Sequence, residues 1–69
     1  RRLNSSVRAL DDQTLMMHIV RGDAQALAEL YERFSSRAFG VARRVLRNDS
    51  EAEEVVQDTF IEIWRSATR

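Results

Sequence analysis

Residues 23–64 read DAQALAELYERFSSRAFGVARRVLRNDSEAEEVVQDTFIEIW and decide the fold of this chain. The first half of this stretch carries apolar residues separated alternately by three and four positions: Ala24, Leu27, Tyr31, Phe34, Ala38, Val41 and Val45. This spacing predicts one helix over residues 24–47, with Asp23 as its N-cap. Further apolar residues widen the stripe beyond the narrow seam of a coiled coil, so a bundle within one chain is favoured over a two-chain coiled coil. Gly40 costs about 1 kcal/mol inside a helix, which suggests that a close helix crossing or a bend uses it.

A second long helix is predicted over residues 51–66. Asn48 and Asp49 interrupt the first pattern, and Ser50 with Glu53 forms a Ser-x-x-Glu capping box. The apolar residues that follow share one face and are expected to pack in the core: Ala52, Val55, Val56, Phe60, Ile63 and Trp64. Because only two or three residues connect the two helices, they should form an antiparallel hairpin.

A shorter helix is predicted upstream of this hairpin. It is about three turns long, is capped by Asp11 or Asp12, and ends at Gly22. Residues 1–10 are polar without periodicity and are predicted to be a flexible leader. Residues 11–69 are therefore predicted to be an all-α domain: a three-helix bundle with a short first helix packed on an antiparallel hairpin of two longer helices.

Composition excludes several classes of function. The 69 residues include no cysteine, one histidine and two glycines, which leaves no material for disulfides, a zinc site or a phosphate-binding loop. The serines lack a base other than His18, so we expect no enzymatic activity, no metal and no cofactor. No apolar run is long enough to span a bilayer, so a cytoplasmic protein in a reducing compartment is expected.

Charge is distributed unevenly although 11 basic and 11 acidic residues cancel. Residues 33–47 contain five arginines and no acid, and residues 49–64 contain six acids and no base. Helix dipoles account for the charges nearest the helix ends, but not for Asp58 or Glu62. A solvated face is the favoured interpretation of the arginines, with contact to a nucleic-acid backbone or to a protein partner as the alternatives.

A polar stripe follows the outer side of the second long helix. It consists of Glu54, Gln57, Asp58, Ile61 and Arg65, with the isoleucine at its centre. A single exposed apolar residue is ordinary on a protein surface, yet an apolar anchor ringed by polar groups is also how a docking surface is built. The residues alone leave both interpretations open.

Residues 51–64, EAEEVVQDTFIEIW, resemble region two of bacterial extracytoplasmic-function (ECF) sigma factors, the small specificity subunits of RNA polymerase. Residues 21–34, RGDAQALAELYERF, resemble the opening of that region at the spacing the family uses. The resemblance covers about residues 10–69, and the VVQDTFI run followed by tryptophan is its most specific part.

The resemblance implies that residues 54 to about 67 dock on the clamp helices of the polymerase β′ subunit. Glu54, Gln57 and Asp58 match the family's polar contact positions, and Ile61 matches an apolar contact. Phe60 and Trp64 are expected mainly in the core, with possible contact to the partner. The resemblance also implies regulation by an anti-sigma factor.

In a complete ECF sigma factor, region two continues into an aromatic and basic helix that reads promoter DNA, and a second domain follows. This sequence stops before both, so promoter binding is expected only of the full-length protein, in agreement with the zero net charge. The alternative function is a helical self-association or regulatory module with no direct role in transcription, in which the short chain completes its core as a homodimer.

Overall fold

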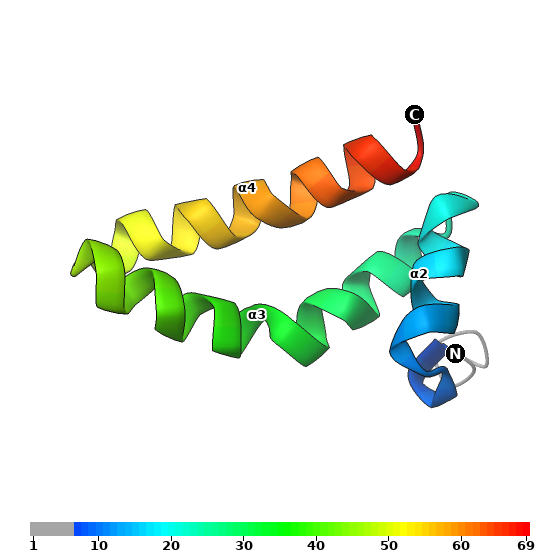
Figure 1. Cartoon of the computed structure of the whole chain (residues 1–69), viewed down its shortest axis with the longest axis horizontal. Coiled ribbons are helices and arrows are strands. Elements are labelled where there is room, and N and C mark those ends of the chain that lie inside the picture. Colours follow the sequence, from blue (N-terminus) through cyan, green and yellow to red (C-terminus); the bar gives the residue numbers. More distant parts are fainter. Residues whose placement is uncertain (1–6) are drawn as a thin grey trace.

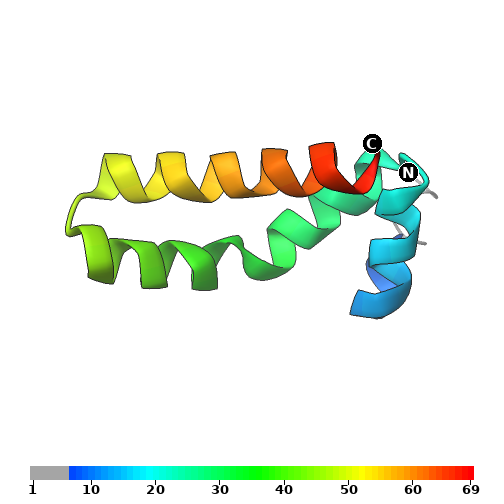
Figure 2. The same cartoon turned by 45° about the horizontal axis from the view of Figure 1, so that its top comes forward.

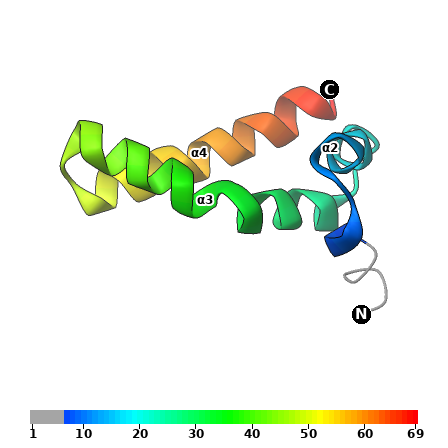
Figure 3. The same cartoon turned by 60° about the horizontal axis from the view of Figure 1, so that its bottom comes forward.

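The computed structural model describes residues 7–69. Its labelled helices are α2 (Asp12–Val20), α3 (Ala24–Leu46) and α4 (Asp49–Ala67). α3 and α4 run antiparallel as a hairpin, and α2 crosses the open end of that hairpin (Figures 1 and 2). Figure 3 views α2 nearly along its axis, beside the start of α3. The prediction of an all-α fold with a short first helix on an antiparallel hairpin is confirmed.

α2 begins at an aspartate cap. The Asp11 Oδ1 accepts a hydrogen bond from the Thr14 N–H at 2.8 Å, which satisfies one of the free donors of the first turn. This backbone hydrogen bond and a second one from the Thr14 side chain hold the pKa of Asp11 below its ordinary value. Of the two predicted caps, Asp11 is therefore the cap and Asp12 is the first helical residue.

A left-handed glycine closes the corner between α2 and α3. Gly22 has a φ angle of +88°, and its N–H donates to the Ile19 carbonyl at 2.9 Å. The Asp23 N–H donates to the His18 carbonyl at 3.0 Å, which completes a Schellman motif. Asp23 then caps α3, because its Oδ1 accepts from the Gln25 N–H at 3.0 Å. The predicted helix stop and the predicted cap are both confirmed.

The connection between α3 and α4 consists of two residues. Arg47 adopts a left-handed conformation with φ of 58°, and its N–H donates to the Arg43 carbonyl at 2.7 Å. The next residue, Asn48, caps α4, since its Oδ1 accepts from the Glu51 N–H at 2.9 Å. The capping box predicted at Ser50 is wrong, because Asn48 caps as well as a serine does and lets the helix begin two residues earlier.

The core lies where α2, the first half of α3 and the second half of α4 meet. Its buried apolar side chains are Val7, Leu15, Ile19, Ala26, Leu30, Val56 and Phe60. Leu15 and Ile19 of α2 have no exposed surface, and the Phe60 ring packs edge to face against Tyr31 with centroids 5.0 Å apart. No polar side chain among the described residues is buried, so hydrophobic packing holds the helices together.

The apolar stripe of α3 is covered over only part of its length. Val41 is 59% exposed and Val45 is 75% exposed, and Val55 on the facing part of α4 is 46% exposed. α2 crosses only the other end of the hairpin (Figure 1), so two helices alone form the end near the turn. The expectation that Val55 packs in the core is wrong for this reason. A Cβ on Gly40 would meet no atom within 4 Å, so no close helix crossing uses that glycine.

The predicted leader covers residues 1–10, of which 1–6 lie outside the described residues. Residues 7–9 are helical, and Val7 is buried in the core. Three backbone carbonyls of this stretch accept hydrogen bonds from Nη2 of Arg33, those of Val7, Arg8 and Leu10 at 3.5, 3.2 and 2.6 Å. The stretch just before α2 is therefore packed and hydrogen-bonded to α3.

Candidate functional site

The polar stripe predicted on the second long helix lies on the outer face of α4. Glu54, Gln57, Asp58 and Ile61 are all exposed, and Ile61 is 53% exposed. Their spacing of three, one and three residues places them on neighbouring turns, opposite the side of α4 that packs against α3. The fold therefore brings the four predicted residues together on one accessible surface, which we call the α4 stripe.

The acids of the α4 stripe have no charged partner within the described residues. The salt bridges that the structure shows over residues 7–69 include neither Glu54 nor Asp58. At the next turn, the Glu62 carboxylate lies 3.7 Å from Arg65 Nη1 and accepts a hydrogen bond from the Ser66 hydroxyl at 3.1 Å. The stripe thus presents two carboxylates without a salt-bridge partner among the described residues, seven and three residues before an exposed isoleucine.

The aromatic residues of α4 serve the core rather than the stripe. Phe60 is buried, and Trp64 is partly buried and packed against the core. Packing of these rings fixes the rotation of α4 about its axis. This rotation in turn determines which residues of α4 face outward.

Arg33 departs from the solvated arginine face that its charge pattern predicts. Its side chain is only 19% exposed, its Nε donates to Glu29 at 2.9 Å and its Nη1 donates to Asp12 at 2.8 Å. The hydrogen bonds to Glu29 and Asp12 raise the pKa of Arg33. The ion pair of Arg33 with Glu29 could be predicted from their spacing of four residues on one helix. The ion pair of Arg33 with Asp12 depends on the tertiary fold.

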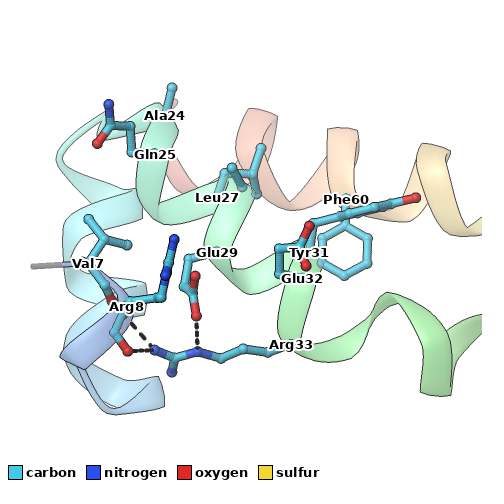
Figure 4. A pocket seen from close by; sticks show the side chains of 11 residues that line it. Val7, Arg8, Ala24, Gln25, Leu27, Glu29, Tyr31, Glu32, Arg33 and Phe60 are labelled. Atoms are coloured by element: carbon cyan, nitrogen blue, oxygen red, sulfur yellow. Dashed lines mark hydrogen bonds and ion pairs between the residues drawn. The ribbon is translucent and has the colours of Figure 1, made fainter. Parts of the chain in front are cut away.

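A surface hollow lies beside this arginine (Figure 4). It measures about 850 Å³ and is lined by residues 7–8, the first half of α3 and Phe60. The ion pair of Arg33 with Glu29 forms part of its wall, so these two charges satisfy each other. We find no unpaired buried side-chain polar atom among residues 7–69, and the hollow offers no pair of groups suited to acid–base chemistry.

Other chemistry has little support in the described range. His18 lies outside this hollow and contacts the Asp23 carboxylate at 3.3 Å. Over residues 7–69 no three His, Cys, Asp or Glu side chains are grouped so as to hold a metal ion. None of the helices in that range combines the length and apolar character that crossing a membrane requires. The α4 stripe is therefore the main candidate site, and its features are those of a protein-binding surface.

Comparison with known proteins identifies a family and several similar proteins. A family model described as Sigma-70 region 2 matches residues 30–69, which include the whole α4 stripe. The chain is 40% identical over 57 residues to the ECF RNA polymerase sigma factor SigK of Mycobacterium sp. (strain KMS), an alignment covering 83% of this chain and 30% of that protein. It is 36% identical over 61 residues to SigK of Mycobacterium ulcerans (strain Agy99), covering 88% of this chain and 33% of that protein.

The chain spans about a third of the length of the curated relatives it matches. No solved structure matches it.

Proposed function

Because this chain belongs to the Sigma-70 region 2 family, we propose that it is the core-binding domain of an ECF sigma factor, which docks on RNA polymerase and directs promoter-specific transcription initiation. The observation that carries this proposal is the α4 stripe, which lies within the residues that match the family. The relatives named as RNA polymerase sigma factors support the same class of function.

The partner surface that fits the stripe is basic with an apolar recess. Glu54 and Asp58 lie one turn apart without cations of their own in the described range, so they are available to pair with basic side chains of a partner. Ile61 supplies the apolar anchor, and the Gln57 amide can both donate and accept. We assign these contacts to the clamp helices of the polymerase β′ subunit, as the resemblance to ECF sigma factors implies.

The remaining functions of the full-length protein follow from this placement. Promoter DNA is contacted in the complete sigma factor, since a domain of zero net charge has little electrostatic affinity for phosphates on its own. An anti-sigma factor that covered the α4 stripe would compete directly with polymerase. Both activities belong in the cytoplasm, where transcription takes place.

Charge reversal on the stripe tests the proposal. Asp58→Arg should weaken binding to RNA polymerase core, and to an isolated fragment carrying the β′ clamp helices, at least tenfold at physiological salt. Adding Gln57→Ala should weaken it further. Glu32→Arg is the matched control, because it makes the same change of net charge at an exposed position on α3. Fluorescence anisotropy measures the affinities, and circular dichroism shows that helicity is kept.

The salt dependence gives a second readout. Charges are screened over about 8 Å at 0.15 M salt, so the affinity of the unchanged chain should fall as salt rises, and the Asp58→Arg variant should show a flatter dependence. Equal losses for Asp58→Arg and Glu32→Arg would refute the assignment of this face. Unchanged affinity in the Asp58→Arg variant would refute it as well.

A further inference from the structure

One side of α3 carries arginines that the function proposed above does not use. Its residues are separated by four, three and four positions: Arg33, Arg37, Gly40 and Arg44. Positions so spaced follow one another along the same side of a helix. Arg47 comes three residues later and is the C-cap of α3, and no acid lies anywhere in residues 33–47. We call these five residues the α3 arginine stripe.

The α3 arginine stripe points away from the core. Gly40 follows Ala38 by two residues, so the two positions lie about 160° apart around the helix at 3.6 residues per turn. Ala38 packs against the core, whereas Arg37, Gly40 and Arg44 are exposed. α2 crosses the other end of the hairpin (Figure 1), so it does not cover this half of α3.

Most of the stripe is not neutralised within the described part of the chain. Arg33 pairs with acids of α2 and α3, and Arg43, which lies beside the stripe, pairs with Asp49. The salt bridges that the structure shows over residues 7–69 include none of the three other arginines: Arg37, Arg44 and Arg47. Their positive charges are therefore available to an anionic ligand.

The position of Arg37 is not explained by the dipole of α3. A dipole favours cations within the last turn of a helix, but Arg37 lies more than two turns before the last residue, Leu46. The guanidinium carbon of Arg37 is 5.9 Å from the centroid of the Phe34 ring, which is a cation–π distance. This contact restrains the side chain, so less freedom is lost when a ligand binds.

Gly40 leaves a gap in the middle of the stripe. A Cβ at this position would meet no atom within 4 Å, so packing within the chain does not require the glycine. Arg37 and Arg44 flank the gap and are about 10 Å apart along the helix at 1.5 Å per residue. Because glycine allows the close approach of another backbone, a ligand that runs along the stripe can contact both arginines without a side chain between them.

We propose that the α3 arginine stripe binds the phosphodiester backbone of double-stranded DNA without regard to sequence. The guanidinium fork of arginine matches the geometry of phosphate oxygens. No apolar side chain belongs to the stripe, whereas the hot spot of a protein interface is built around a buried anchor such as Ile61 offers on the α4 stripe. No aromatic side chain belongs to it either, and single strands bind by stacking their bases on aromatic rings.

The zero net charge of the whole chain keeps this contact weak. The contact gains importance when another interaction holds the chain beside DNA, because the effective concentration of phosphates is then high. Docking of the α4 stripe on RNA polymerase would have this effect, and this consequence alone rests on the proposed function. The α4 stripe lies opposite the side of α4 that packs against α3, so a partner there leaves the α3 arginine stripe accessible.

Fluorescence anisotropy with a labelled duplex of random sequence, at about 20 mM salt, tests the site. The slope of log affinity against log salt is about −0.9 for each phosphate contacted, hence about −2.7 for three arginines. Arg37→Gln and Arg44→Gln should each weaken binding at least threefold and flatten this slope by about 0.9. Arg21→Gln is the matched control, because it makes the same change of net charge at an exposed arginine away from the stripe, and it should bind like the unchanged chain.

A neutral substitution tests the gap. Gly40→Gln keeps the net charge and places a side chain between the two arginines, so it should weaken duplex binding at least threefold. Ala28→Gln adds the same side chain at an exposed position of α3 away from the stripe and should leave binding unchanged. Circular dichroism shows whether all of the variants are folded.

Four outcomes would overturn the proposal. The first is a duplex that stays unbound at low salt, and the second is an equal loss of affinity in Arg21→Gln and Arg44→Gln. The third is binding of polyglutamate, or of a single strand of the same sequence, as tight as that of the duplex. The fourth is an Arg44→Gln variant that binds the duplex normally but loses affinity for RNA polymerase core. A failure of the α4 stripe to bind polymerase, tested with Asp58→Arg, would leave all of these results unchanged.

Discussion

The two glycines of this chain have opposite backbone environments, so the same substitution should change stability in opposite directions. Gly22 has a φ angle of +88° in the corner between α2 and α3, whereas Gly40 lies inside α3. A Cβ added at either position would meet no atom within 4 Å. Because neither substitution causes a steric clash with its surroundings, backbone preference alone decides the outcome.

The magnitudes follow from these conformations. Gly40→Ala should stabilise the fold by about 0.5–1 kcal/mol, since alanine loses less conformational entropy in a helix. Gly22→Ala forces a Cβ into the left-handed region at a cost of about 1–2 kcal/mol, partly offset by a less flexible unfolded chain. The two variants should therefore differ by about 2 kcal/mol in the free energy of unfolding.

Urea denaturation followed by circular dichroism and Trp64 fluorescence measures this difference. With a slope of about 1 kcal/mol per molar urea for a small domain, the two midpoints should lie roughly 2 M apart. All chains are compared at one protein concentration, because association adds stability. Ala28→Gly, at an exposed position inside α3, is the control and should destabilise by about the amount that Gly40→Ala gains.

The result that would refute this reasoning is a change of the same sign at both positions. A loss of stability in Gly40→Ala would show that the glycine is needed for packing or for a bend. An unchanged midpoint in Gly22→Ala would show that the corner between α2 and α3 adapts without strain.

Three further predictions concern the helix caps, the core and the arginine beside the hollow. Arg33→Gln should speed amide hydrogen exchange in residues 7–12, because the carbonyls there lose their donor, whereas Arg37→Gln should leave this exchange unchanged. The lowered pKa of Asp11 stabilises the fold above the unfolded pKa of about 3.9, and this stabilisation is lost as pH falls through the folded value. Asp11→Asn should thus be less stable than the unchanged chain near neutral pH, and in thermal melts the difference should shrink as the pH falls below about 4 and vanish below the folded pKa of Asp11. Leu15→Ala should cost about 2–5 kcal/mol in urea titrations and leave little folded protein, because Leu15 is fully buried.

The helices and two of their caps could be predicted because the signals are local. The alternation of three and four residues in α3 and α4 is the helical repeat itself, and Asp11 and Asp23 cap the residues directly after them. The α4 stripe could be located for the same reason, since residues that share a helix face are determined by spacing alone.

Features that depend on tertiary contacts could not be predicted. Val7 is one apolar residue in a polar stretch and has no periodicity to reveal its burial. The contact of Arg33 with Asp12 joins residues 21 positions apart. The exposure of Val45 depends on how far α2 reaches along the hairpin, which no spacing in the sequence encodes. Asparagine and serine are both favoured at an N-cap, so the sequence alone did not show whether Asn48 or Ser50 caps α4.

The two-residue connection at Arg47 and Asn48 also bears on how fast the chain folds. It brings α3 and α4 together with almost no loop to close, and closing a short loop costs little time or entropy. Chains dominated by such local contacts fold in microseconds to milliseconds. We expect α3 and α4 to pair first, starting at this turn, and α2 and Val7 to pack against them afterwards. The end of the molecule that holds the core is then the last part to form.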